Sequence, residues 1–223
     1  MTKNYYETGY QQSVQYGNLT KVEEYDGSGN LYRCTQREYY PNPTAWIVNK
    51  VISEKVQQSC AGSGSGVASW TTYVYTSGAD WEMPPDSKGQ LLTMRRATGT
   101  GSFVDTRYTY DAWGNVVTET NYQGYGSIGA LATSSPRSVT TTYDSTFHLL
   151  PVTVVNALNK TTTIGYDLVL GRPLTVTDAN NQATYYRYDV FGRLSSMTRP
   201  GDSLTYPTLA YTYFDFAYHD SEA

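Results

Sequence analysis

Residues Thr184 to Leu194 read Thr-Tyr-Tyr-Arg-Tyr-Asp-Val-Phe-Gly-Arg-Leu and contain a complete β-hairpin signal. Threonine and tyrosine alternate with other residues up to Tyr188, which is typical of a strand with one aromatic face. Asp189 stands where a type I turn prefers aspartate, and Gly192 stands three residues later, where such a turn prefers glycine. Glycine can adopt a positive φ there without a Cβ clash. The stretch therefore predicts two strands joined by a tight turn.

The same motif recurs along the chain, each time as a Tyr-Asp pair followed by a glycine or a residue in its place. The copies are Tyr25, Asp26 and Gly29; Tyr110, Asp111 and Gly114; Tyr143 and Asp144, with His148 in the glycine position; Tyr166, Asp167 and Gly171; and Tyr188, Asp189 and Gly192. The last three copies are 22 to 23 residues apart. A fixed period of this size predicts a repeat architecture.

A second turn signal lies about half a period from the first. Asn156-Ala157-Leu158-Asn159 and Asp178-Ala179-Asn180-Asn181 each begin with Asn or Asp and end with Asn. Asparagine is the non-glycine residue that best tolerates the left-handed conformation. Each repeat therefore has two turns joined by strands of about six or seven residues.

Composition agrees with an all-β fold. The 223 residues include 23 tyrosines, and only 16% are charged, against about 25% in typical soluble domains. Tyrosine, threonine and valine favour strands. The net charge of −4 argues against a nucleic-acid partner, which would require a basic face. No apolar run is long enough for a membrane-spanning helix, and residues 1–4 lack the apolar region of a signal peptide. We therefore expect any export signal to lie outside this chain or to be of a kind other than a cleaved signal peptide.

We expect three parts: an N-terminal hairpin or degenerate repeat (1–33), an irregular β insertion in which the period is lost (34–102), and an array of the Tyr-Asp repeats with an incomplete last unit (103–223). Within the second part, residues 46–56 fit both strand and helix spacing, and their β-branched content favours a strand. Within the third, residues 124–136 are rich in glycine, serine and alanine and are expected to form a solvated loop.

Tyr-Asp followed by Gly-Arg or Gly-Asn at this period resembles the YD repeats of the Rhs family, which also occur in teneurins and in B/C components of insecticidal toxin complexes. The best matches begin at Tyr188, Tyr166 and Tyr110, and the resemblance is closest over residues 103–202. It implies tandem antiparallel hairpins that form a curved or spiralling sheet, a segment of a shell that often encloses a C-terminal toxin or effector. The sequence contains no recognisable effector domain or self-cleaving segment, and it has too few repeats to close a shell.

Candidate sites are few. Cys34 and Cys60 would form a disulfide in an exported protein, and two free thiols are the alternative. Together with His148 and His219 they match the ligand count of a zinc site, but their spacing does not, so we expect no metal and no cofactor. The turn aspartates have too few oxygen neighbours for a calcium loop and are expected to cap turns. The motif tyrosines either fill the sheet face or offer a stacking surface.

Catalytic motifs are also lacking. The glycine-rich run 62–66 has neither the lysine of a phosphate loop nor the central serine of a nucleophile elbow, and we expect no enzyme. The first hypothesis is a non-catalytic segment of an extracellular or cell-surface β-shell. Its open edges, which include Tyr5, Tyr6, Glu7, Tyr10 and 209–214, would pair with the rest of a longer chain or with other copies. The alternative is an aromatic-rich module that binds a glycan or protein through Trp70, Trp81 and Trp113.

Overall fold

The computed structural model describes residues 1–6, 16–60, 67–99 and 101–214. These residues form antiparallel strands and one short 3-10 turn, η1 (Pro43–Ala45). The chain divides into two compact units, Met1–Ser138 and Val139–Ala223. The three-part division expected from the sequence remains a prediction. The expected positions of Glu7, Tyr10, His219 and the run 62–66 lie outside the described residues.

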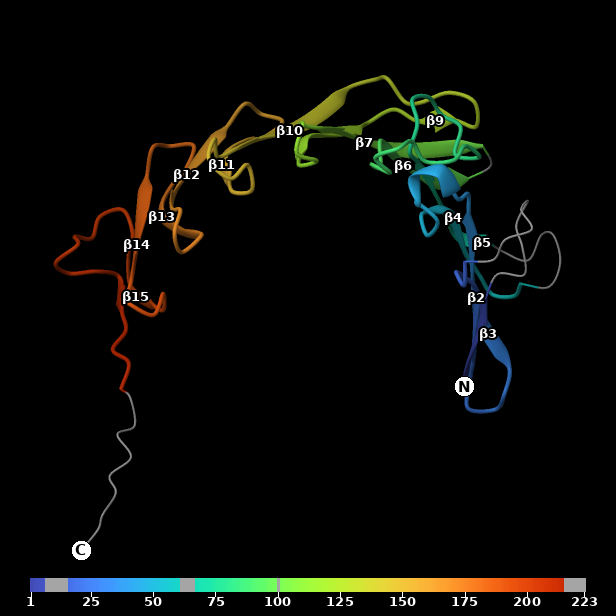
Figure 1. Cartoon of the computed structure of the whole chain (residues 1–223), viewed down its shortest axis with the longest axis horizontal. Helices are drawn as coiled ribbons and strands as arrows, with labels where there is room; N and C mark the ends of the chain where they lie inside the picture. The colour runs from blue at the N-terminus through green and yellow to red at the C-terminus, as the bar shows by residue number, and fades with distance from the viewer. Residues whose placement is uncertain (7–15, 61–66, 100, 215–223) are drawn as a thin grey trace, which may run out of the picture. The chain divides into compact units, whose positions relative to one another are not determined.

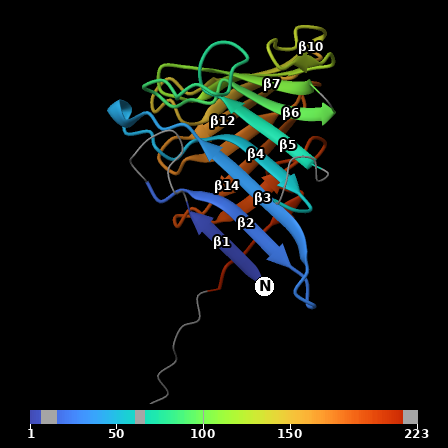
Figure 2. The same ribbon diagram turned by 90° about the vertical axis from the view of Figure 1, so that its right-hand side faces the viewer.

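In the first unit, strands that follow one another in sequence also lie side by side, as Figure 2 shows for β1 to β7. The strands are β1 (Thr2–Tyr6), β2 (Leu19–Tyr25), β3 (Leu31–Tyr39), β4 (Val51–Gln57), β5 (Val67–Val74), β6 (Thr93–Gly99), β7 (Ser102–Tyr110), β8 (Val116–Tyr122) and β9 (Gly126–Ser127). The short strand β9 pairs with β7 outside this order. The next strand, β10 (Pro136–Tyr143), begins at the end of this unit.

The second unit is a simple series of hairpins (Figure 1). After β10 its strands are β11 (Pro151–Val155), β12 (Thr161–Asp167), β13 (Arg172–Thr177), β14 (Ala183–Tyr188), β15 (Leu194–Thr198) and β16 (Leu209–Ala210). A one-residue register shift accompanies the motif tyrosine at the end of β10, β12 and β14. The prediction of an all-β fold of tandem antiparallel hairpins is confirmed.

The buried apolar side chains of the described residues belong to the first unit. Ile52, Val74 and Phe103 are fully buried. Trp70 packs edge to face against both Trp81 and Phe103, with ring centroids 5.4 Å apart in each pair. In the second unit the described strands are mostly half-buried, so backbone hydrogen bonds and turns carry a larger share of its organisation.

Two local predictions are corrected by the structure. Residues 46–56 form a strand only from Val51 onward. Before it, Asn42 caps η1 through its side chain, and Trp46 adopts a φ of 55°, which ends any extended run there. The loop 124–136 is not simply solvated: β9 pairs with β7, and Gly126 and Ala132 are buried against the sheet.

Candidate functional site

The motif turns that begin at Asp26, Asp111 and Asp189 share one backbone geometry. The amide of Asp189 donates to the carbonyl of Arg193 at 2.9 Å, and the amide of Gly192 donates to the carbonyl of Asp189 at 2.9 Å. Gly192 has a φ of 73° and Gly114 has a φ of 91°. A type I turn followed by a left-handed residue is a common three-residue hairpin loop. The prediction of left-handed glycines at these two positions is confirmed.

The motif aspartate closes each turn through its side chain. In the Asp189 turn, Oδ1 accepts the amide N–H of Phe191 at 3.0 Å and of Arg193 at 2.8 Å. Oδ2 accepts Nε of Arg193 at 2.7 Å. In the Asp111 turn, the residue after glycine is Asn115, whose Nδ2 donates to Oδ2 of Asp111 at 2.9 Å. In these two turns, Arg193 and Asn115 therefore each supply a side-chain donor to Oδ2 of the aspartate.

The first copy of the motif follows the same pattern. Oδ1 of Asp26 accepts the amides of Ser28 at 2.9 Å and Asn30 at 2.8 Å, and Gly29 has a φ of 83°. The pKa of Asp26 is lowered, first by the backbone N–H of Asn30 and then by the side chain of Asn30. These acids are therefore held ionised by their own turns.

Longer motif loops preserve the role of the aspartate. Asp144 accepts four backbone amides, from Thr146, Phe147, Leu149 and Leu150. These bonds, led by that of Leu150, hold the pKa of Asp144 far below its usual range. His148 occupies the expected glycine position with a φ of 56°. In the Asp167 loop, Oδ1 accepts the amides of Val169 and Leu170, and Gly171 has a φ of 63°.

The turns half a period away repeat this geometry with different residues. Oδ1 of Asn156 accepts the amides of Leu158 at 2.9 Å and Lys160 at 3.1 Å, and Asn159 has a φ of 56°. Asp178 and Asn181 form the equivalent turn, with a φ of 60° at Asn181. In both kinds of turn, a side-chain oxygen of the first residue thus accepts backbone amides of the loop.

The tyrosines near strand ends donate their hydroxyls to carbonyls at or near the start of the preceding strand. The pairs are Tyr39 to Leu19 (3.0 Å), Tyr75 to Val51 (3.0 Å), Tyr110 to Leu91 (2.7 Å), Tyr188 to Pro173 (2.9 Å) and Tyr213 to Leu194 (2.8 Å). Burial raises the pKa of Tyr75 to about 12, and it also raises the pKa of Tyr110, Tyr166 and Tyr188. The hydroxyls of Tyr75, Tyr110 and Tyr188 therefore stay protonated and serve as fixed links between strands.

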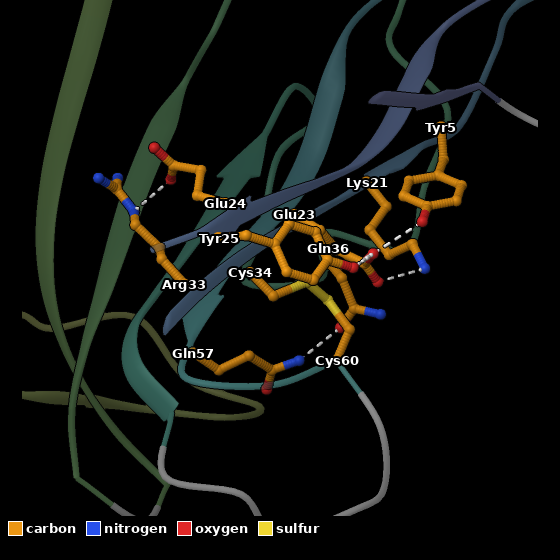
Figure 3. The surroundings of a disulfide bond; sticks show 10 residues. All are labelled: Tyr5, Lys21, Glu23, Glu24, Tyr25, Arg33, Cys34, Gln36, Gln57 and Cys60. Carbon is orange, nitrogen blue, oxygen red and sulfur yellow. Dashed lines mark hydrogen bonds and ion pairs between the residues drawn. A yellow bond between two sulfur atoms is a disulfide. The ribbon is translucent and has the colours of Figure 1, made fainter. Parts of the chain in front are cut away.

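The Cys34 and Cys60 sulfurs are bonded in the structure, with Cα atoms 5.7 Å apart (Figure 3). Cys34 lies on β3 and is fully buried, whereas Cys60 follows β4, so the bond ties two neighbouring segments. The adjacent side chains Gln57 and Gln36 also link β4 to β3, through an Nε2 to Oε1 hydrogen bond of 2.8 Å.

Next to this disulfide lies a polar cluster centred on Glu23, the residue that pairs with Cys34 across β2 and β3 (Figure 3). Lys21 Nζ donates to Glu23 at 2.8 Å, and the hydroxyls of Tyr5 and Tyr25 each donate at 2.7 Å. These contacts, led by Lys21, lower the pKa of Glu23 to about 2. Tyr25 thus differs from Tyr110 and Tyr188, because its hydroxyl partner is a carboxylate instead of a backbone carbonyl.

The sequence did not indicate the most deeply buried polar group, an ion pair on one face of β6 and β7. Arg95 and Asp105 are both 0% exposed, and Nε of Arg95 donates to Oδ1 of Asp105 at 2.9 Å. The other guanidinium nitrogens of Arg95 donate to backbone carbonyls of Ala79, Ser127, Ile128 and Ala130. The ion pair thus holds two loops onto the sheet. It is structural, because its donors and acceptors are used within the fold.

No group of acidic, histidine or cysteine side chains in the described part of the chain could hold a metal ion. Among the described residues, no helix is long and apolar enough to cross a membrane.

Comparison with known proteins bears on the second unit. Residues 166–204 match the model of the RHS Repeat family. This stretch is similar to an RHS repeat. The resemblance inferred from the Tyr-Asp motifs is confirmed there, and the RHS repeat includes the Asp167 and Asp189 turns and the strands from β13 to β15.

A search of curated proteins finds no match. Among solved structures, the chain is similar to the TcdB2-TccC3 crystal structure without its hypervariable C-terminal region (15% identity, TM-score 0.42), covering 82% of this chain and 10% of that one. It is also similar to a chain of a Photorhabdus luminescens Tc holotoxin pore (14% identity, TM-score 0.41), covering 82% of this chain and 11% of that one. This chain therefore spans about a tenth of the length of those chains.

Proposed function

We propose that this chain is a non-catalytic structural segment of an Rhs/YD-repeat β-shell in an exported or surface protein. The observation that carries the proposal is the internal use of the repeated polar groups. Asp189 is bonded within its own turn, and Tyr188 is bonded to the preceding strand. Because the hydrogen bonds of these side chains are used within the fold, the side chains support a structural role instead of the binding of a substrate.

The RHS repeat over residues 166–204 supports this proposal. One of the similar solved structures is a Tc holotoxin pore, and this chain corresponds to about a tenth of the matched chains. In the proposed role, it contributes one stretch of hairpins to a larger wall, whose strands continue on either side.

The sheet edges are the proposed contact points. Within the described residues, β1 pairs with β2, and β16 pairs with β15, at the two ends of the strand order. An edge strand with unpaired amides and carbonyls is a template for another strand. Its partner is the rest of a longer chain or, for the isolated chain, a second copy.

Light scattering across a concentration series tests this role. The amide of Tyr211 donates to the carbonyl of Ser195, so the alternation of an antiparallel ladder turns the amide of Thr212 outward. Thr212→Pro removes that outward donor without breaking the bond to β15. We expect the mean mass of the wild type to rise with concentration and that of the variant to stay monomeric. A wild type that remains a monomer at every concentration would contradict edge pairing.

The alternative, an aromatic surface for a glycan or protein, is supported by Trp113, which is exposed at a turn tip. Trp70 and Trp81 pack against each other, which leaves less of their surface for a ligand. The first function therefore has the broader support.

A further inference from the structure

A groove of about 470 Å³ lies on the first unit over β6 and β7. This volume is within the range of roughly 300–1,000 Å³ that is usual for small-molecule sites. Most of its lining residues carry a hydroxyl or amide group, among them Thr76, Ser77, Gln90, Thr93, Thr109 and Tyr110, but carbon atoms make up the larger part of the exposed wall. Two leucines, Leu92 and Leu131, add apolar surface. Such a lining suits a small ligand that carries several hydroxyls.

Arg107 is the only charged residue that lines this groove among the described residues. Its Nη2 donates to the carbonyl of Ala132 at 2.5 Å, and its guanidinium carbon lies 4.6 Å from the ring centroid of Tyr122. These two contacts fix the orientation of the guanidinium. Its Nε is buried and has no hydrogen-bond partner in the structure. A buried donor without a partner is costly, which favours an acceptor at this position.

The charge on Arg107 is not balanced locally. Asp105, two residues away on the same face of β7, is already bonded to Arg95 and to the amide of Ala132. Arg95, in contrast, directs its three guanidinium nitrogens to partners within the fold. The three groups Arg95, Asp105 and Arg107 therefore leave one net positive charge beside the groove.

We propose that this groove binds a small hydroxylated carboxylate, the chemistry of an acidic sugar unit. The positive charge of Arg107, which lines the groove, attracts the carboxylate. The hydroxyls of Ser77 and Thr109 and the amide of Gln90 take the ligand hydroxyls. This binding is separate from the proposed structural function in a β-shell and does not depend on it.

The test is a titration of the full chain with glucuronate, followed by calorimetry or ligand-observed NMR. Glucose, which lacks the carboxylate, and acetate, which lacks the hydroxyls, are the matched probes. Arg107→Gln removes the cation, and Ser77→Trp fills the groove from an exposed loop position that leaves the Arg107 contacts in place. Arg96→Gln is the control, because Arg96 is exposed and points to the other face of β6.

We expect glucuronate to bind the wild type and Arg96→Gln equally, and to bind Arg107→Gln and Ser77→Trp about tenfold more weakly or worse. Glucose and acetate should bind more weakly than glucuronate by a similar factor. If Arg107→Gln does not fold, Ser77→Trp decides the result. The proposal is overturned if glucuronate does not bind, if Ser77→Trp binds it as well as the wild type does, or if acetate binds equally well.

Discussion

The hydroxyl of Tyr188 donates to the carbonyl of Pro173 at 2.9 Å, and this bond joins the end of β14 to the start of β13. The backbone pairing of these two strands runs only from Thr175 to Thr177 on β13. The tyrosine thus supplies a donor where the ladder has already ended. The four other tyrosine-to-carbonyl bonds extend this arrangement into both units.

Removing this hydroxyl tests its contribution. Tyr188→Phe should lower the free energy of unfolding by about 1 kcal/mol, because a half-buried carbonyl loses its donor. Tyr185→Phe is the matched control on the same strand: Tyr185 is 45% exposed, and no hydrogen bond of its hydroxyl is seen among the described residues. Urea unfolding of both variants measures the difference. Equal effects would show that the link to Pro173 adds nothing.

The left-handed glycine of the motif makes a second prediction. A Cβ at Gly192 would meet its nearest atoms only at 3.6 Å, so the cost of Gly192→Ala comes from its φ of 73°. We expect a loss of about 1–2 kcal/mol. Gly165→Ala, on β12, is the control, because Gly165 has no positive φ and its Cβ would lie 3.8 Å from Thr175. Thermal unfolding should separate the two, and a neutral Gly192→Ala would rule out the conformational explanation.

Gly126 is constrained by space instead of by φ. A Cβ there would lie 2.5 Å from both Nη2 of Arg95 and Oδ2 of Asp105. Gly126→Ala should therefore cost about 3 kcal/mol, as expected when a buried ion pair is disturbed. Gly129→Ala, in the same loop, meets no atom within 4 Å and should change stability by less than about 0.5 kcal/mol. Hydrogen exchange of β6 and β7 measures the loss, and similar protection in both variants would count against it.

Acid should weaken the cluster around Glu23. Its pKa is about 2 in the folded chain against 4.5 normally, so the folded state favours the ionised form. The resulting stabilisation is fully present above pH 4.5 and is lost as the pH falls toward 2. Glu23→Gln lacks this titration. The stability of the wild type should therefore fall toward that of the variant as the pH falls through this range. Denaturation at several pH values gives the comparison. Parallel curves for the two proteins would exclude a role for Glu23.

The disulfide gives the fifth prediction. Cys34 and Cys60 are 26 residues apart, and closing a loop of this length stabilises a fold by about 3.5 kcal/mol in the chain-entropy estimate. A reducing agent should lower the unfolding temperature of the wild type and leave a Cys34→Ser, Cys60→Ser double variant unchanged. Mass spectrometry after alkylation without reduction should find no labelled thiol in exported protein. Two labelled cysteines would mean that the thiols are free there.

The turns could be predicted from sequence because their geometry is local. Asp189 and Gly192 are three residues apart, and the aspartate bonds lie within the same loop. The ion pair of Arg95 and Asp105 could not be predicted from the sequence, because it depends on which face of the strands is covered by other parts of the chain. The cover comes from backbone carbonyls, such as that of Ser127, which have no sequence signature. The same reason explains why the loop 124–136 was expected in solvent.

The hydrogen bonds that close the Asp189 and Asp167 turns use the aspartate side chain and backbone amides, and the apolar side chains between the aspartate and the glycine take no part in them. Val190 is 92% exposed in the Asp189 turn, and Val169 is 95% exposed in the Asp167 turn. Substitution at these tips, or insertion of a residue as in the Asp167 loop, leaves the closing bonds intact. The margins of the sheet can therefore diversify during evolution while the hairpins that carry them stay the same.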